Sequence, residues 1–304
     1  MRVTNSMITG TVVGNLNGAL ERLTNYQNQV SSGKRITRAS DDPAGTGRSM
    51  ALRSSLADTE QYAKNIDGVT GRLKQMDVSL GNISGALAQT KRLALSGGSS
   101  TMDSTQRGLL ANQVQSQIDS VLNEVNGKYL GSQLYGGHKT DTIPVAQTPT
   151  SPPAYAYNGD DGVTRVQVSD NTTMDVSLTA KQILNFDGAT DSSVPDVLSV
   201  MTGLKEDIAS GNLDGITEKL KQLDTSYDNV LAQRGAVGVK SQQLNLYSDR
   251  LADAKQSLSG LITDNEEVDL TEAVTGLQRE QNAYQASLIA ASQIIHPSLA
   301  DFLK

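Results

Sequence analysis

Residues 270–295 read LTEAVTGLQREQNAYQASLIAASQII, and this stretch near the end of the chain decides the fold. Its seam positions are separated by four and three residues in alternation, which places them along one side of a helix. The positions are Leu270, Val274, Leu277, Gln281, Tyr284, Leu288, Ala291 and Ile295. A second helix must cover such a seam, so the stretch predicts a helical interaction surface.

The same spacing occurs near the start of the chain, at Leu16, Leu20, Leu23, Gln27 and Val30. The glutamines Gln27 and Gln281 either specify the register and the partner or are exposed at a loosely packed end. Short helices interrupted in this way are marginally stable in water. We therefore expect residues 1–45 and 268–304 to form a terminal coiled-coil region that is disordered in the monomer and folds on assembly.

Long helices are predicted between the two ends. The cleanest pattern runs from Ile66 to Leu87 in uninterrupted steps of three and four, and the glycine pair after Ser96 ends it. Further apolar stripes occupy residues 110–125, 197–208 and 216–262, with a break expected at 263–265. Gly235 and Gly238 argue against one straight helix through the last stripe. These stretches predict a helical core of residues 46–135 and 195–267.

Residues 136–194 have a different composition. Four of the seven prolines fall between Pro144 and Pro153, which disfavours helix there. Apolar residues then alternate over 163–168 and 172–178, after a turn around Asn158-Gly159, so we predict an inserted β-rich domain. The two halves mirror each other around this insert. The expected fold is mainly α: a long antiparallel helical rod or coiled coil formed by the N- and C-terminal halves, with a small inserted β-domain.

The segment between the first two predicted helices contains Gly33, Asp41, Asp42 and Pro43. Gly33 is suited to ending the first helix. Asp41 or Asp42 can cap the next helix, and Pro43 fits its first turn. The segment is either a plain linker or a shaped inter-domain loop with contacts of its own.

Composition excludes several classes of function. The chain has no Cys, which rules out disulfides and thiolate metal sites, and only two His. Its net charge of −7 and its 4% of aromatic residues disfavour nucleic-acid binding. No apolar run approaches the ~20 residues that a membrane span needs. The first residues lack the apolar region of a cleaved signal peptide, so we expect the chain to be cytosolic or exported by another route.

No catalytic or cofactor motif is present. Gly45-Thr46-Gly47 lacks the spacing of a phosphate-binding loop, and Asp160-Asp161 lacks that of an EF-hand, so capping and turn formation explain them better. We therefore expect no enzyme activity, no cofactor and no metal.

Two terminal motifs resemble the flagellin superfamily. Residues 29–36 read QVSSGKRI, residues 40–45 read SDDPAG, and the C-terminal signature runs from Asp269 to Leu288. Within the superfamily, the chain is most similar to the hook–filament junction proteins. Residues 1–7, 125–130 and 136–140, with Pro144, carry that closer resemblance.

The resemblance implies a structural adaptor of the bacterial flagellum. Its implied partners are hook-associated protein 1, flagellin, a flagellar export chaperone and other copies of the same chain in a ring. Implied too are type III export without a cleaved signal peptide and an extracellular location on the flagellum. The expected assembly interface consists of Leu16, Leu20, Leu23, Val30, Leu277, Tyr284, Leu288, Ala291 and Ile295.

Two other functions remain open at this stage. The chain could be filament flagellin itself, which shares the terminal motifs. It could also be a helical adhesin or a secretion-system tip protein that uses the β-rich insert as its binding site.

Overall fold

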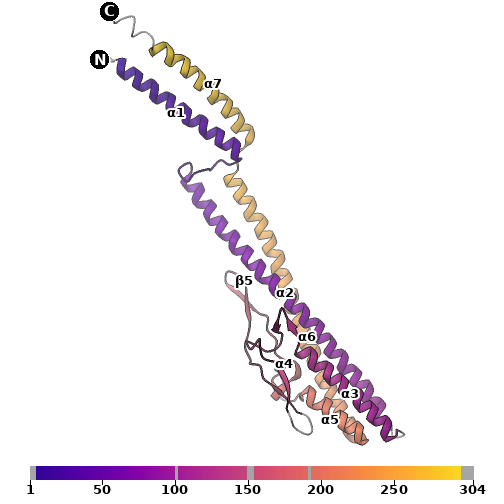
Figure 1. The fold of residues 1–304 in the computed structure, drawn as a ribbon. Coiled ribbons are helices and arrows are strands. Elements are labelled where there is room, and N and C mark those ends of the chain that lie inside the picture. Colours follow the sequence, from indigo (N-terminus) through magenta and orange to yellow (C-terminus); the bar gives the residue numbers. More distant parts are fainter. Residues whose placement is uncertain (1–4, 100–101, 149–153, 191–192, 296–304) are drawn as a thin grey trace, which may run out of the picture. The chain divides into compact units, whose positions relative to one another are not determined.

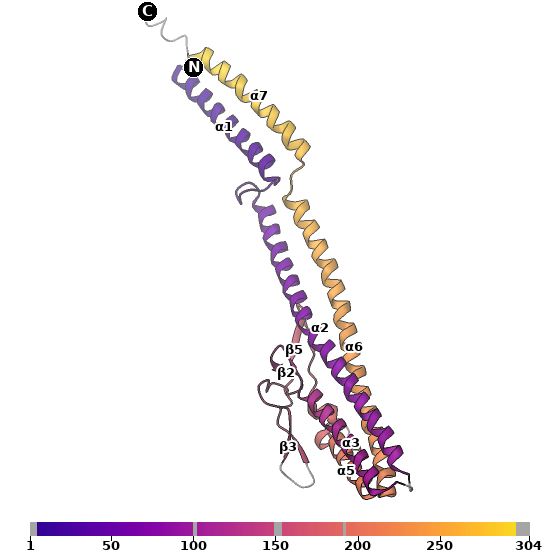
Figure 2. The same ribbon diagram turned by 45° about the vertical axis from the view of Figure 1, so that its right-hand side comes forward.

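The computed structural model describes residues 5–99, 102–148, 154–190 and 193–295. The chain divides into two compact units, which Figures 1 and 2 show from two directions. The terminal unit contains residues 1–58 and 253–304, and the central unit contains residues 59–252. Long helices and small antiparallel sheets make up the described residues, as expected from the sequence.

Seven α-helices are assigned in the described residues. They are α1 (Asn5–Ser32), α2 (Pro43–Gly97), α3 (Ser104–Val125), α4 (Ala180–Leu184), α5 (Val197–Ser210), α6 (Leu213–Glu266) and α7 (Leu270–Ile295). One 3-10 helix, η1 (Phe186–Gly188), follows α4. The strands pair as β1 (Lys128–Tyr129) with β2 (Ser132–Gln133), β3 (Val145–Thr148) with β4 (Ala154–Tyr157), and β5 (Arg165–Ser169) with β6 (Thr172–Asp175).

The core of the central unit is formed mainly by α2, α3, α5 and α6, and residues of the β-rich part such as Tyr135 and Val168 pack into it. In both views α2 and α6 lie side by side, with α3 and α5 beside them. Arg234 bonds to Asp77, and Lys91 bonds to Asp224, so α2 and α6 are antiparallel within this unit. Buried residues on α6 recur every seventh position, at Ile216, Leu223, Val230, Val237 and Leu244. This is the burial pattern of a coiled-coil seam.

The helix ends follow their capping residues. Gly33, with φ of 70°, follows the end of α1, and Asn126 caps the end of α3. Asp196 accepts from the amides of Leu198 and Ser199 at the start of α5. The expected stops at Gly33 and at the glycine pair after Ser96 are confirmed, and α3 ends at Val125, the last residue of its predicted stripe.

Helix α6 is longer and less interrupted than the sequence predicted. It continues through Gly235 and Gly238, and it passes the predicted break at residues 263–265 to end at Glu266. Val237, which lies between the two glycines in sequence, is 3% exposed in the core, and this packing outweighs the low helix propensity of the glycines. Asn265 donates to Gly45 O at 2.9 Å and to Ser49 Oγ at 2.7 Å, which holds the final turn against α2.

Where the structure describes the β-rich part, its strands form three separate hairpins. The strands predicted over 163–168 and 172–178 correspond to β5 and β6, joined in an antiparallel register. The β1–β2 hairpin begins at Lys128, before the predicted start of the insert, and α4 lies inside the insert. Neither was expected, because two-residue strands and a five-residue helix are too short to produce a periodic pattern.

None of the described helices is long and apolar enough to cross a membrane.

Candidate assembly surface

Helices α1 and α7 form an antiparallel pair in the terminal unit, side by side in Figures 1 and 2. Arg22 Nε donates to Glu280 Oε2 at 3.1 Å. A Cβ added at Gly276 would lie 2.5 Å from Tyr26 Cε1, so only glycine allows the ring to approach α7 this closely. The first turn of α1 and the last turn of α7 therefore lie at the same end of the pair.

The contact between α1 and α7 is narrow. Its buried members are small: Ala19, Ala273, Gly276 and Ala291. Larger side chains at its edges are only half-buried, namely Leu16, Leu23, Tyr26, Val30, Leu277 and Tyr284. Small residues allow the helices to approach closely, and the larger apolar side chains beside them keep part of their surface in water.

The predicted interface residues divide between two faces of this pair. Leu16, Leu23, Val30, Leu277, Tyr284 and Ala291 lie toward the contact between the helices. Leu20 and Leu288 lie outside it, 44% and 43% exposed. Gln27 and Gln281 are exposed in the single chain. The side chain of Ile295 lies outside the described residues.

Sequence reasoning did not single out Ala19, Tyr26, Ala273 or Gly276. Ala19, Leu23, Tyr26 and Val30 also step by four, three and four, so a second stripe was present beside the one chosen. Heptad positions assigned from leucine and other large apolar residues do not reveal a contact made by alanine and glycine.

Several large apolar side chains remain uncovered on each helix of the terminal pair. Val13 and Leu20 are seven residues apart on α1, and Val274 and Leu288 are fourteen apart on α7, so each couple shares one side of its helix. Val13 is 49% exposed and Val274 is 40% exposed. Repeated exposed apolar side chains of this kind are typical of surfaces that bind another protein.

The loop between α1 and α2 is bonded to the segment between α6 and α7. Arg35 N donates to Glu266 O at 2.7 Å, and Val268 N donates to Gly33 O at 3.1 Å. Arg35 also donates through Nη2 to Asn265 O at 3.0 Å. These bonds resolve the alternative left open by the sequence: the segment is a shaped loop.

We call the loop of residues 33–42 together with residues 265–268 the joint. Glu266 is the charged residue at its centre. Arg53 donates to both of its carboxylate oxygens, at 2.9 and 2.7 Å, and Lys34 Nζ approaches Oε2 at 3.1 Å. The Glu266 side chain is only 10% exposed. Hydrogen bonds from Arg53, followed by that from Lys34, lower the pKa of Glu266 to about 2.

Asp41, Asp42 and Pro43 have separate roles in the loop. Asp41 Oδ2 accepts from Thr37 N at 3.2 Å and from Arg38 N at 2.8 Å. Asp42 Oδ1 accepts from Gly45 N at 2.8 Å, which caps α2, and Pro43 is the first residue of that helix. These backbone amides lower the pKa of both carboxyl groups. Asp42 is therefore the capping residue, whereas Asp41 shapes the turn.

The joint has the features of a structural connection. Because Asp42 occupies the Gly45 amide, the glycines at the start of α2 do not offer that donor to an anion. In the β-rich part, Asp160 Oδ1 accepts from the amides of His138 and Gly162, which is turn formation. No group of three or more metal-ligating side chains occurs in the part of the chain that the structure describes.

Comparison with known families gives two matches at the two ends of the chain. The bacterial flagellin N-terminal helical region matches residues 3–136. The bacterial flagellin C-terminal helical region matches residues 220–303. Together they leave out mainly the β-rich part and α5.

The individual relatives include hook-associated proteins. Flagellar hook-associated protein 3 of Salmonella typhimurium is 25% identical over 287 residues, covering 85% of this chain and 86% of that protein. Its Escherichia coli counterpart is 25% identical over 307 residues, covering 92% of each. A solved structure of a flagellar hook-associated protein from Vibrio parahaemolyticus is 25% identical with a TM-score of 0.67, covering 75% of this chain and all of that one.

The N-terminal flagellin region matches the start of this chain and the C-terminal region matches its end. The hook-associated relatives match most of its length. The chain therefore belongs to the flagellin superfamily, and within it to the hook-associated protein 3 family.

Proposed function

We propose that this protein is a structural, non-enzymatic adaptor that joins the flagellar hook to the flagellin filament. One observation carries the proposal: the terminal helix pair leaves Leu20 and Leu288 uncovered on its outer side. A subunit that works alone would expose this apolar surface permanently, whereas a subunit packed among others would bury it. The family relatives support a place at the hook rather than along the filament.

In this proposal, the terminal region is the part that assembles. Leu16, Leu23, Val30, Leu277, Tyr284 and Ala291 hold α1 against α7, while Leu20 and Leu288 pack into neighbouring subunits. Ile295 is proposed to extend the same interface. The neighbours are hook-associated protein 1 on one side, the first flagellin subunits on the other, and further copies of the chain in a ring. An export chaperone is proposed to hold the chain before it leaves the cell through the type III route, without a cleaved signal peptide, for its extracellular site.

The domain proposal follows from the same reasoning. Residues 1–45 and 268–304 fold only on assembly, because their own contact is too narrow to stabilise two helices in water. Residues 46–135 and 195–267 form the helical core, and residues 136–194 form the β-rich insert. The loop containing Asp41, Asp42 and Pro43 connects the assembling region to that core.

The test is Leu288→Asp in cells whose own copy of the gene has been replaced. Because Leu288 is 43% exposed, the variant subunit should fold normally. An aspartate buried against a neighbour would lack a partner, which is costly. We expect flagellin in the medium and no attached filaments. Leu109→Asp, at a leucine of α3 that is 60% exposed, is the matched control and should leave filaments in place. Normal filament growth on Leu288→Asp cells would count against the proposal.

A second experiment separates the adaptor from filament flagellin. Purified protein is added to hook fragments and to filament seeds, and growth is followed by electron microscopy. An adaptor should add one limited layer at the hook end, whereas filament flagellin would extend the seeds into long filaments. For the adhesin or secretion-tip alternative, the full chain would bind a host surface without any hook present.

A further inference from the structure

The tip of the β1–β2 hairpin carries an exposed leucine in an unfavourable backbone conformation. Leu130 has a φ of 49°, is 88% exposed and precedes Gly131. Lys128 pairs with Gln133 and Tyr129 pairs with Ser132, so Leu130 and Gly131 form the two-residue turn. Asn, Asp or Gly usually occupies the first position of such a turn, because positive φ disfavours larger side chains. Within its own chain, this leucine gains little burial to offset the unfavourable conformation.

The hairpin is fixed against α2. Tyr129 is half-buried, and a methyl group at Gly71 of α2 would overlap the Tyr129 hydroxyl group. The hydroxyl end of Tyr129 therefore lies against α2 at Gly71. Because Tyr129 anchors the hairpin there, Leu130 is presented at a defined place on the central unit.

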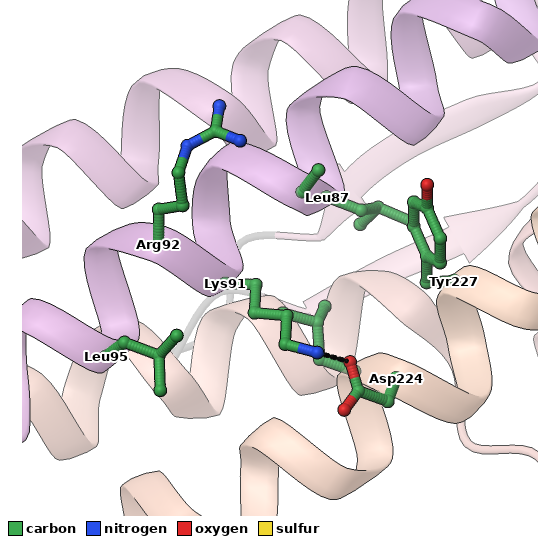
Figure 3. Close-up of a pocket in the computed structure, with 8 residues that line it drawn as sticks. Leu87, Lys91, Arg92, Leu95, Asp224 and Tyr227 are labelled. Atoms are coloured by element: carbon green, nitrogen blue, oxygen red, sulfur yellow. Dashed lines mark hydrogen bonds and ion pairs between the residues drawn. The ribbon is translucent and has the colours of Figure 1, made fainter.

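The same unit contains an apolar groove of about 340 Å³ between α2 and α6. Leu87 and Leu95 line it from α2, and Tyr227 lines it from α6 (Figure 3). Leu223 of α6 also lines the groove. Leu95 is 60% exposed, so this side of the groove is open to a partner. Its volume is large enough for a leucine side chain together with part of a turn.

The charged groups at the groove leave one carboxylate oxygen available. Lys91 Nζ lies 2.5 Å from Asp224 Oδ1, and the Asp224 side chain is 51% exposed. Arg92 points away from Asp224 in Figure 3 and donates through Nε to Gln89 Oε1 at 2.9 Å. Lys128, two residues before Leu130, is exposed and can supply a second cation to Asp224.

We propose that Leu130 of one copy inserts into the Leu87–Leu95–Leu223–Tyr227 groove of a second copy, with Lys128 beside Asp224. This inference rests on the proposed self-assembly and names the surfaces that would carry it. A protruding residue and a groove at different places on one molecule form a head-to-tail contact, which closes into a ring or continues as a helix. The hairpin lies beside Gly71 of α2, and the groove lies beside Lys91 of the same helix. The twenty residues from Gly71 to Lys91 correspond to roughly 30 Å along α2, so two copies in the same orientation would be offset by that distance.

Cysteine cross-linking tests the contact directly, because the chain has no native Cys. The full-length double variant Leu130→Cys with Leu95→Cys is expressed in cells that lack the native protein, and isolated hook–filament complexes are oxidised mildly. We expect a covalent dimer of the chain on non-reducing gels. Leu130→Cys with Leu109→Cys is the control, because Leu109 is as exposed as Leu95 and lies outside the groove. The absence of dimer, or equal dimer in both variants, would overturn the inference.

Charge reversal gives a second measurement on the same cross-link. Lys128→Glu and Asp224→Lys should each lower the yield of Leu130–Leu95 dimer several-fold, and the combination should restore much of it. If the dimer yield of the combined variant fell by the sum of the two single decreases, the result would contradict the proposed ion pair. Filament attachment is scored in parallel: attached filaments without the cross-link reject this contact alone, whereas normal filaments in a strain lacking the whole chain reject the adaptor function.

Discussion

The heptad seams of α2 and α1 have the same spacing and different surroundings. On α2, six of the seven seam residues, Ile66, Leu73, Met76, Leu80, Ile83 and Leu87, are at most 1% exposed, and the seventh, Val69, is half-buried. On α1, none of Leu16, Leu20, Leu23, Gln27 and Val30 is buried. Three further helices of the central unit surround the α2 seam, whereas α1 meets α7 across a narrow contact of alanine and glycine.

This difference teaches what a heptad pattern specifies. The spacing fixes which side of a helix carries apolar residues, but it does not state which molecule covers them. In the central unit the same chain supplies the cover. In the terminal unit, seam residues such as Leu20 and Leu288 stay exposed and are available for a neighbouring subunit. The pattern near the two ends therefore predicts assembly rather than a core formed within one chain.

Hydrogen exchange on the purified monomer should give the largest contrast between the two regions. Amides of α1 and α7 should exchange with opening free energies near zero, whereas core amides of α2 and α6 in the central unit should approach the global free energy of unfolding, about 5–15 kcal/mol. The same measurement on assembled complexes is the control, and there the terminal amides should become protected. Strong protection of both ends in the monomer would refute folding on assembly.

A pair of leucine truncations should show the next largest effect. Leu80, on α2, is fully buried, so Leu80→Ala should lower the free energy of unfolding by about 2–5 kcal/mol in urea titrations. Leu20→Ala removes the same atoms from a site that is 44% exposed and should change the value by less than about 0.5 kcal/mol. Equal losses in the two variants would mean that the Leu20 face is already covered in the monomer.

Gly276→Ala probes the close approach of α1 and α7. The new methyl group would meet the Tyr26 ring. Overpacking costs about 1–3 kcal/mol, while replacing a helical glycine recovers about 1 kcal/mol, so the pair should be weakened by up to about 2 kcal/mol. We expect filaments to detach from Gly276→Ala cells at a lower temperature than from unmodified cells.

Gly260→Ala is the matched control for this substitution. Gly260 lies in α6 of the same unit, and an added Cβ there would meet no atom within 4 Å. The variant should hold its filaments at least as well as the unmodified protein. If both glycine variants released filaments equally early, the Tyr26 contact would not be the cause.

Much of the fold was predictable because its signals are local. The Ile66–Leu87 stripe, the stop after Ser96 and the capping of α2 by Asp42 depend on residues close together in sequence. The end of α6 was predicted too early, because the anchor of Asn265 is Ser49, more than two hundred residues away in the chain. The β1–β2 hairpin was missed because its strands are too short to show a period of two.

The assembly surface was predictable only in part. The spacing identified Leu16 and Tyr284, which do lie toward the contact between α1 and α7. It could not tell which leucines point away from that contact. Leu20 and Leu288 are exposed because the contact passes through Ala19 and Gly276 instead. The ion pairs of Glu266 with Arg53 and Lys34 lacked any sequence signal, since each joins residues more than two hundred positions apart.

The smallest expected effect concerns pH at this joint. The pKa of Glu266 is lowered to about 2 from an ordinary value of 4.5, chiefly by hydrogen bonds from Arg53. A carboxyl group whose pKa is lower in the folded state stabilises that state above its ordinary pKa, and the contribution is lost as the pH falls from about 4.5 through about 2. Carbon-13 NMR of the Glu266 carboxyl group should show a midpoint near 2. Arg53→Gln should move the midpoint upward, whereas Arg48→Gln, on the same helix, should leave it in place. A midpoint near 4.5 in the unmodified chain would mean that Arg53 does not bind Glu266 in solution, and the joint would then be held by the backbone bonds of Arg35 and Val268 together with the bonds of Asn265.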